Sequence, residues 1–165
     1  MKIMKMHEMK TMPNADKTQY TKLLWMAVIS FIAMFILMYS MVDRLANVVP
    51  NINQFYMAGL MTAPMIIIEM ALMGSMYMNK KLNLLIIAIS AVVLIACFLF
   101  IRMQTGVSER QFLKSMIPHH AAAILMVKEA KLSDPEIKKL ANDIISSQQK
   151  EIDFMKARLK EMDNK

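Results

Sequence analysis

The sequence predicts an all-α protein in which three transmembrane helices are followed by an antiparallel helical hairpin. Its 165 residues are 56% hydrophobic and have a mean hydropathy of +0.36, and the apolar residues are gathered into three long runs. After the third run, apolar residues recur at three- and four-residue steps on both sides of a turn signal at residues 133–136. That pattern is typical of two amphipathic helices joined by a tight turn. We therefore divide the chain into a tail (1–21), a membrane region (22–103) and an appended domain (108–165).

Each of the three apolar runs is long enough to cross a bilayer, which requires about 20 residues. They extend from Leu23 to Val42, from Phe55 to Met78 and from Leu82 to Ile101, and Glu69 is their only charged residue. The first run is longer than the apolar part of a signal peptide, and no small-x-small cleavage site follows it. We expect it to remain as an anchor.

Basic residues around the runs predict how the chain crosses the membrane. The tail is rich in lysine and the second loop carries Lys80 and Lys81, whereas the first loop has only Arg44 beside Asp43. The positive-inside rule places the tail and second loop in the cytoplasm. Three crossings then put residues 108–165 on the outer side, periplasmic or extracellular, of a bacterial-type inner or plasma membrane.

The formal net charge of +7 does not indicate nucleic-acid binding. Acidic and basic residues are interspersed over residues 108–165, as on a solvated helical surface. The excess positive charge lies mostly in the tail and second loop, where topology and anionic lipid explain it. We expect membrane lipid, and no nucleic acid, as a partner.

The second run differs from the others in its methionines and its carboxyl group. The methionines follow helical spacing and continue beyond Glu69, at Met57, Met61, Met65, Met70, Met73 and Met76. Such a stripe is either a relay of soft ligands across the membrane or ordinary packing. A carboxyl group deep in a span is costly unless it is paired or neutral. Glu69 is therefore either functional or a protonated packing group.

The tail contains clustered thioethers around one histidine, at Met1, Met4, Met6, His7, Met9 and Met12. Methionines in a short polar tail have no core to fill, so packing does not account for them. Two interpretations remain, a segment that loads a soft metal and a tail that merely tolerates methionine.

Capping signals delimit both helices of the hairpin. Ser108 begins a capping arrangement ahead of a helix that is expected to run to about Lys131. Asp134 is the predicted cap of the second helix, with Pro135 in its first turn. That helix is expected to end near Met162.

The spacing also predicts which faces the hairpin buries. On the first helix the predicted face consists of Phe112, Met116, His119, Ala123, Met126 and Ala130. On the second helix it consists of Ile137, Leu140, Ile144, Gln148, Glu151, Met155, Leu159 and Met162. Gln148 and Glu151 would be costly to bury without partners. A metal site with Met116 and His119 would satisfy them, and the alternative is an ion pair between Glu151 and a histidine that only holds the hairpin.

The chemistry of that site is indicated by the run Met116-Ile117-Pro118-His119-His120, in a chain where 21 of 165 residues are methionine. Thioether and imidazole groups together form the donor set that a soft ion such as Cu(I) prefers. Pro118 removes one helical hydrogen bond just before the two imidazoles.

These residues resemble the domain of unknown function family 305, a ferritin-like helical domain with members linked to copper and silver binding. The resemblance covers nearly all of residues 108–165 and is carried by Phe112, Met116, Ile117, His119, His120, Ala123, Met126, Asp134, Pro135, Glu136, Ile137, Leu140, Ala141, Ile144, Ile145, Gln148, Gln149, Glu151, Ile152 and Met155. It implies Met116, His119, His120, Met126 and Met155 as ligands of Cu(I) or Ag(I). The chain departs from the family at Arg158, where members often carry Trp, and at Ala121-Ala122, where members carry Gln-Gly.

The sequence thus predicts a membrane-anchored Cu(I)- or Ag(I)-binding protein for sequestration, tolerance or hand-over to a partner such as a metal transporter or metallochaperone. A two-helix unit buries little surface, so we expect oligomerisation into a four-helix bundle. The alternative is a structural membrane protein whose hairpin mediates oligomerisation or docking without metal. We do not expect an enzyme, since there is no Glu-x-x-His motif for a di-iron site and no nucleophile beside a base.

Overall fold

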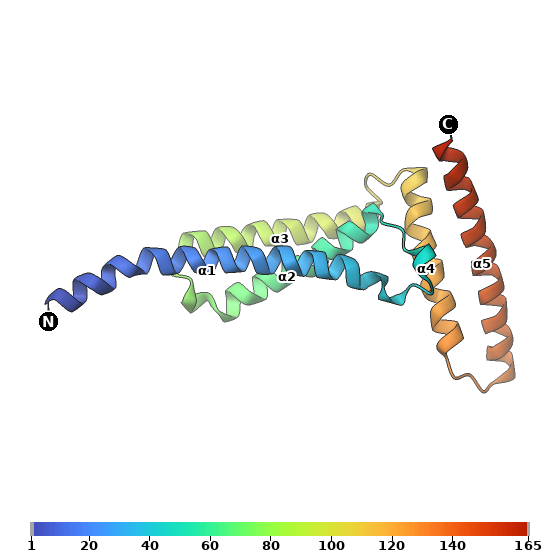
Figure 1. Cartoon of the computed structure of the whole chain (residues 1–165), viewed down its shortest axis with the longest axis horizontal. Helices are drawn as coiled ribbons and strands as arrows, with labels where there is room; N and C mark the ends of the chain where they lie inside the picture. Colours follow the sequence, from blue (N-terminus) through green and yellow to red (C-terminus); the bar gives the residue numbers. More distant parts are fainter. Residues whose placement is uncertain (1, 165) are drawn as a thin grey trace. The chain divides into compact units, whose positions relative to one another are not determined.

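The computed structural model describes the backbone of residues 2–164 and the side chains of residues 17–164. Over that range the ordered elements are all helical (Figure 1). The α-helices are α1 (Lys2–Leu37), α2 (Ile52–Leu72), α3 (Lys80–Met103), α4 (Glu109–Glu129) and α5 (Pro135–Asp163). The methionines and His7 proposed to load metal precede Lys17, so their side chains lie outside the described residues.

Two compact units make up the chain. The first contains residues 1–34 and 57–99, which provide most of α1, α2 and α3. The second contains residues 35–56 and 100–165, which include the first loop, α4 and α5.

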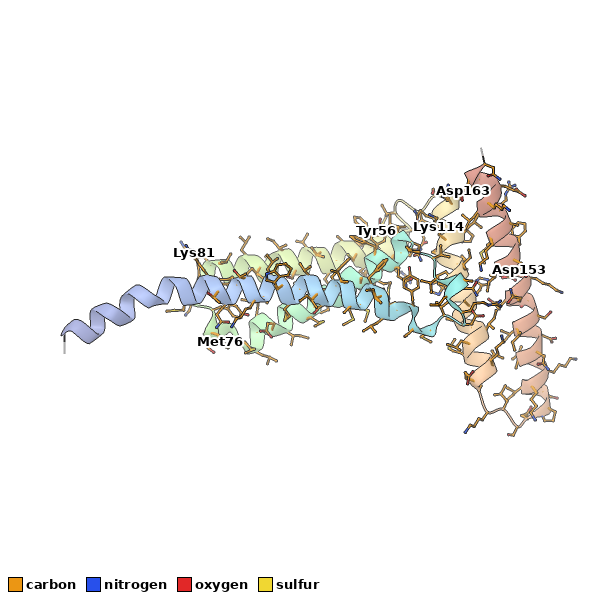
Figure 2. All side chains as sticks on the ribbon, viewed as in Figure 1. Tyr56, Met76, Lys81, Lys114, Asp153 and Asp163 are labelled. Atoms are coloured by element: carbon orange, nitrogen blue, oxygen red, sulfur yellow. The ribbon has the colours of Figure 1, made fainter. Side chains whose placement is uncertain are left out.

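Three helices are long and apolar enough to cross a membrane, as predicted: Lys17–Met41, Ile52–Leu72 and Lys80–Met103. The second is shorter than expected. It ends at Leu72 instead of Met78, because the chain turns into a short 3-10 helix, η3 (Gly74–Met76). Met73 and Met76 therefore lie beyond the helix (Figure 2), and the predicted continuous methionine stripe is not carried by one helix.

A small residue, Gly59, lets the helices of the first unit approach closely. A Cβ atom built on Gly59 of α2 would lie 2.8 Å from Sγ of Cys97 on α3 and 3.9 Å from Cε2 of Phe31 on α1. Any side chain at this position would push the neighbouring helix away. Cys97 thus has a packing role, with its thiol against the Gly59 backbone.

The second unit contains the predicted antiparallel hairpin of α4 and α5 (Figure 1). Both predicted caps are confirmed. The Gln111 N–H donates to Oγ of Ser108 at 3.4 Å, and the N–H groups of Glu136 and Ile137 donate to Oδ1 of Asp134 at 2.8 and 3.0 Å. The two helix ends are joined by an ion pair between Arg110 and Asp163, the latter labelled in Figure 2.

The buried face of the hairpin differs from the predicted one. Its core consists of Ile117, Ala121, Ile124, Ile152 and Met155, whereas the predicted face is largely exposed at Phe112, His119, Met126, Ile137 and Leu140. The reason is a second neighbour. Helix α4 packs against α5 and also against the first loop, where Val42 and Val49 contact the core. Because α4 is buried on two sides, the centre of its buried face lies about one residue away from the centre that the spacing predicted.

A polar network connects the first loop to α5, and no sequence pattern predicted it. Asn47 is fully buried. Its Nδ2 donates to Oδ1 of Asp43 at 2.5 Å, and its Oδ1 accepts from Nζ of Lys156 at 2.5 Å. Nη2 of Arg44 donates to Oε1 of Gln149 at 2.6 Å. Every polar atom of the Asn47 side chain is thereby occupied, which makes its burial tolerable.

The attachment of this loop is expected to weaken in acid. Burial alone would raise the pKa of Asp43, but hydrogen bonds from Asn47 and Arg44 and the charge of Arg44 outweigh it and hold the pKa below its usual range. Because the folded pKa is the lower one, Asp43 stabilises the folded loop above its unfolded pKa of about 4. That contribution is lost as the pH falls through the folded value. Hydrogen exchange of residues 42–51, corrected for intrinsic rates, should accelerate below about pH 4, and Asp43→Asn should abolish the pH dependence. Protection that is insensitive to pH in the unaltered chain would contradict this.

Candidate metal centre

Helix α4 places its two histidines in different surroundings. Successive residues on a helix are rotated by about 100°, so His119 and His120 cannot face the same neighbour. The His120 side chain points toward α5 and is only 12% exposed, whereas His119 is exposed. The two imidazoles are therefore available to different partners.

His120 is oriented by two hydrogen bonds. Its Nδ1 lies 2.9 Å from the carbonyl oxygen of Met116, and its Nε2 lies 2.6 Å from Oε2 of Glu151 on α5. A carbonyl oxygen can only accept, so Nδ1 carries a proton and donates it. The 2.6 Å contact between Nε2 and Oε2 of Glu151 is a hydrogen bond, and its proton belongs either to the ring or to the carboxyl group.

This arrangement is the one that metal-binding imidazoles adopt. Such a ring usually donates one N–H to a backbone carbonyl or carboxylate, which fixes the tautomer and directs the other nitrogen at the metal. In His120 the second nitrogen is Nε2, which contacts the Glu151 carboxylate in this structure. That contact also fits the alternative interpretation, in which an ion pair between Glu151 and a histidine holds the two helices together.

The structure brings together only some of the predicted site residues. Glu151 contacts His120, which fits the predicted ion pair between Glu151 and a histidine. Gln148 is half-buried one turn before Glu151. Met155 is 6% exposed and packs in the hairpin core, whereas Met126 is 54% exposed on α4. Among the described side chains, no three of His, Cys, Asp and Glu are grouped so that they could hold an ion.

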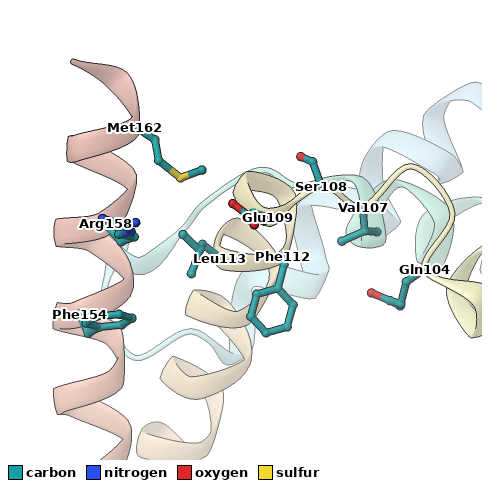
Figure 3. Close-up of a pocket in the computed structure, with 9 residues that line it drawn as sticks. All are labelled: Gln104, Val107, Ser108, Glu109, Phe112, Leu113, Phe154, Arg158 and Met162. Atoms are coloured by element: carbon teal, nitrogen blue, oxygen red, sulfur yellow. The ribbon is translucent and has the colours of Figure 1, made fainter. Parts of the chain in front are cut away.

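Two apolar pockets flank the histidines on the open side of the hairpin. A pocket of about 570 Å³ lies toward the start of α4, between Phe112 and Leu113 on that helix and Phe154, Arg158 and Met162 on α5 (Figure 3). A smaller pocket lies toward the turn, lined by residues that include Met126, Ala130, Ile137, Leu140 and Ile144. We call this open side, with the histidines between the two pockets, the hairpin groove. Phe154 was not identified from the sequence, because the predicted stripe passes through its neighbour Met155.

Glu69 has a partner at the end of α2. It lies in the last turn of that helix instead of deep in a span, and its Oε1 accepts a hydrogen bond from the Tyr77 hydroxyl at 3.4 Å. The Tyr77 ring packs against Tyr20 at 5.2 Å between centroids, and the Tyr20 hydroxyl donates to Oδ1 of Asn83 at 2.5 Å. These contacts favour a role in holding α1, α2 and α3 together. A metal relay through Glu69 stays a prediction.

Comparison with known proteins shows the family to which the chain belongs. Residues 68–159 match the family described as Domain of unknown function (DUF305). An uncharacterized protein of Acanthamoeba polyphaga mimivirus is 37% identical over 142 residues, which is 84% of this chain and 91% of that protein. No solved structure matches. The chain therefore belongs to the DUF305 family, and the matched range includes His119, His120 and Glu151. The matched range begins at residue 68 in α2, whereas the resemblance described in the sequence covers only residues 108–165.

Proposed function

We propose that this chain is a membrane-anchored protein that binds Cu(I) or Ag(I) and either sequesters the ion or hands it to a partner such as a metal transporter or metallochaperone. The observation that carries the proposal is the orientation of His120. Its Nδ1 is committed to a backbone carbonyl, and its Nε2 is directed at the Glu151 carboxylate, so that two potential metal ligands lie side by side.

The surrounding donors favour a soft ion. Met116 lies one turn before His120 and is half-buried beside the hairpin core, and His119 adds a second, exposed imidazole. Thioether and imidazole ligands favour Cu(I), whereas a magnesium or calcium site requires several oxygen ligands. Three membrane-spanning helices would hold the hairpin at the outer surface.

A single hairpin is an incomplete ferritin-like unit. Two helices with one open face bury too little surface for a stable independent core, and two such hairpins would complete a four-helix bundle. We therefore include a homo-oligomer in the proposal.

The second candidate function is a structural or docking protein without metal. The 2.6 Å contact between His120 and Glu151 supports it, because an imidazolium held between a carbonyl and a carboxylate would join α4 to α5 by itself.

A competitive Cu(I) titration of the full chain in detergent micelles, with Zn(II) as the contrasting metal, separates the two functions. We expect Cu(I) to bind at least about 100-fold more tightly than Zn(II) because of the soft donors. A matched chain that lacks residues 1–16 should retain this affinity, since the proposed site lies in the hairpin. Absent or equal binding of the two ions would favour the structural function.

A further inference from the structure

The hairpin groove is an apolar face that the rest of the second unit leaves open. Five large side chains along it are at least half exposed: Phe112 at 50%, Met126 at 54%, Ile137 at 50%, Leu140 at 58% and Phe154 at 67%. On another side of the same hairpin, by contrast, Val42 and Val49 of the first loop cover the core. Contiguous exposed apolar surface of this kind marks an interaction site.

Polarity varies along the groove in a definite order. The pocket between Phe112 and Phe154 lies at one end, and the pocket between Met126 and Leu140 lies at the other. The contact between His120 and Glu151 lies between them. His119 falls on the same stripe, because residues 112, 116, 119, 123 and 126 follow helical three- and four-residue steps. The groove thus has two apolar ends and a polar centre.

This order fits a second copy related by a two-fold axis. In such an interface the same surface patch is used by both subunits. If the copies run antiparallel, the larger pocket of each receives the apolar side chains at the turn end of the other. The polar centre then faces its own counterpart. A parallel arrangement would instead put each pocket against an identical pocket.

The size of the groove is sufficient for such an interface. The 21 residues of α4 span about 31 Å, and two adjacent helices are about 20 Å wide. The flat projection is on the order of 600 Å², which reaches the lower end of the roughly 600–1,000 Å² that each partner buries in a specific, stable interface.

We propose that a second copy of this chain occupies the hairpin groove in antiparallel orientation, and that the metal centre is completed between the copies by His119 and His120 of both. This inference rests on the proposed function. It explains why, within one chain, His120 is the one imidazole oriented beside a second potential ligand, the Glu151 carboxylate. It also assigns a role to His119, which is exposed in the single chain. Metal binding and dimerisation are then linked, so each strengthens the other.

The test is a groove variant that keeps every histidine. Leu140→Asp/Phe154→Asp places charge at both apolar ends, on side chains that are exposed in the single chain. Asn142→Asp/Ser146→Asp adds the same charge at exposed positions of α5 outside the stripe, and serves as the matched control. The full chains are studied in detergent by analytical ultracentrifugation and Cu(I) titration at several protein concentrations.

We expect the unaltered chain and the control to be dimers whose Cu(I) affinity rises with protein concentration. The groove variant should be monomeric and bind Cu(I) at least about tenfold more weakly, which corresponds to about 1.4 kcal/mol. Hydrogen exchange of α4 and α5 verifies that the variant is folded, and Leu140→Ser/Phe154→Ser replaces it if it is not.

Three outcomes would overturn the inference. If the groove variant binds Cu(I) as tightly as the unaltered chain, the centre lies within one copy, and the proposed function stands without this inference. If the unaltered chain is monomeric and the variant changes only its bound detergent or lipid, then lipid occupies the groove. If no form binds Cu(I), the proposed function fails as well, and the masses of the variants still show whether a second copy occupies the groove.

Discussion

Ile117→Ala is expected to destabilise the α4–α5 hairpin by about 2–5 kcal/mol, because it removes a fully buried side chain and leaves a cavity. Ile117 is 0% exposed and lies at the centre of the core that α4, α5 and the first loop share. Hydrogen exchange measured by mass spectrometry on the full chain provides the readout. The slowest amides of α4 and α5 should exchange faster by the factor that corresponds to this loss.

Phe112→Ala is the matched control on the same helix. Phe112 is large and apolar but half exposed, so its truncation should change the stability of the monomeric hairpin by no more than about 0.5 kcal/mol, as for most surface substitutions. The pair distinguishes the observed buried face from the one that the spacing predicted, which contains Phe112 and omits Ile117. A larger loss for Phe112→Ala than for Ile117→Ala would show that the predicted face is the buried one.

The features that were predictable from the sequence are local ones. Ser108 and Asp134 cap their helices as expected, because a capping side chain contacts backbone groups only two or three residues away. The number of spans follows equally from the length and polarity of contiguous runs. The end of α2 was missed because Met73, Met76 and Met78 continue the apolar run after the helix has stopped. Gly74-Ser75 was the local sign of the turn.

Features that depend on distant residues could not be predicted in this way. Helical periodicity predicts that a helix has an apolar stripe. Which face of the helix is most buried also depends on how many neighbours pack against it. Residues 43–49 read as an ordinary loop, and nothing local indicates that Asn47 bonds to Lys156, more than a hundred residues later. Glu151 was expected near a histidine, and it contacts His120. Periodicity did not show which of the two histidines faces α5, because their side chains are rotated by about 100° from each other around the helix.

Those two histidines carry the second large prediction. His119→Ala/His120→Ala is expected to weaken Cu(I) binding by the full chain more than about 100-fold, or about 2.8 kcal/mol, because it removes both imidazoles from a site with few other donors. The fold should persist. His119 is exposed, and His120 contributes one contact to α5 outside the apolar core, so hydrogen exchange of α4 and α5 should change little.

Single substitutions then separate ligation from positioning. Glu151→Gln keeps a hydrogen-bond acceptor near Nε2 of His120 but removes the negative charge, and a group that only orients a ligand typically costs 10–100-fold in metal affinity when altered. We therefore expect Glu151→Gln to bind Cu(I) more weakly than the unaltered chain and more tightly than the double histidine variant. Asn142→Ala/Ser146→Ala, at two exposed positions of α5, is the control and should bind normally. If the double histidine variant binds Cu(I) as the control does, neither imidazole is a ligand, and the contact between His120 and Glu151 serves only to join α4 to α5.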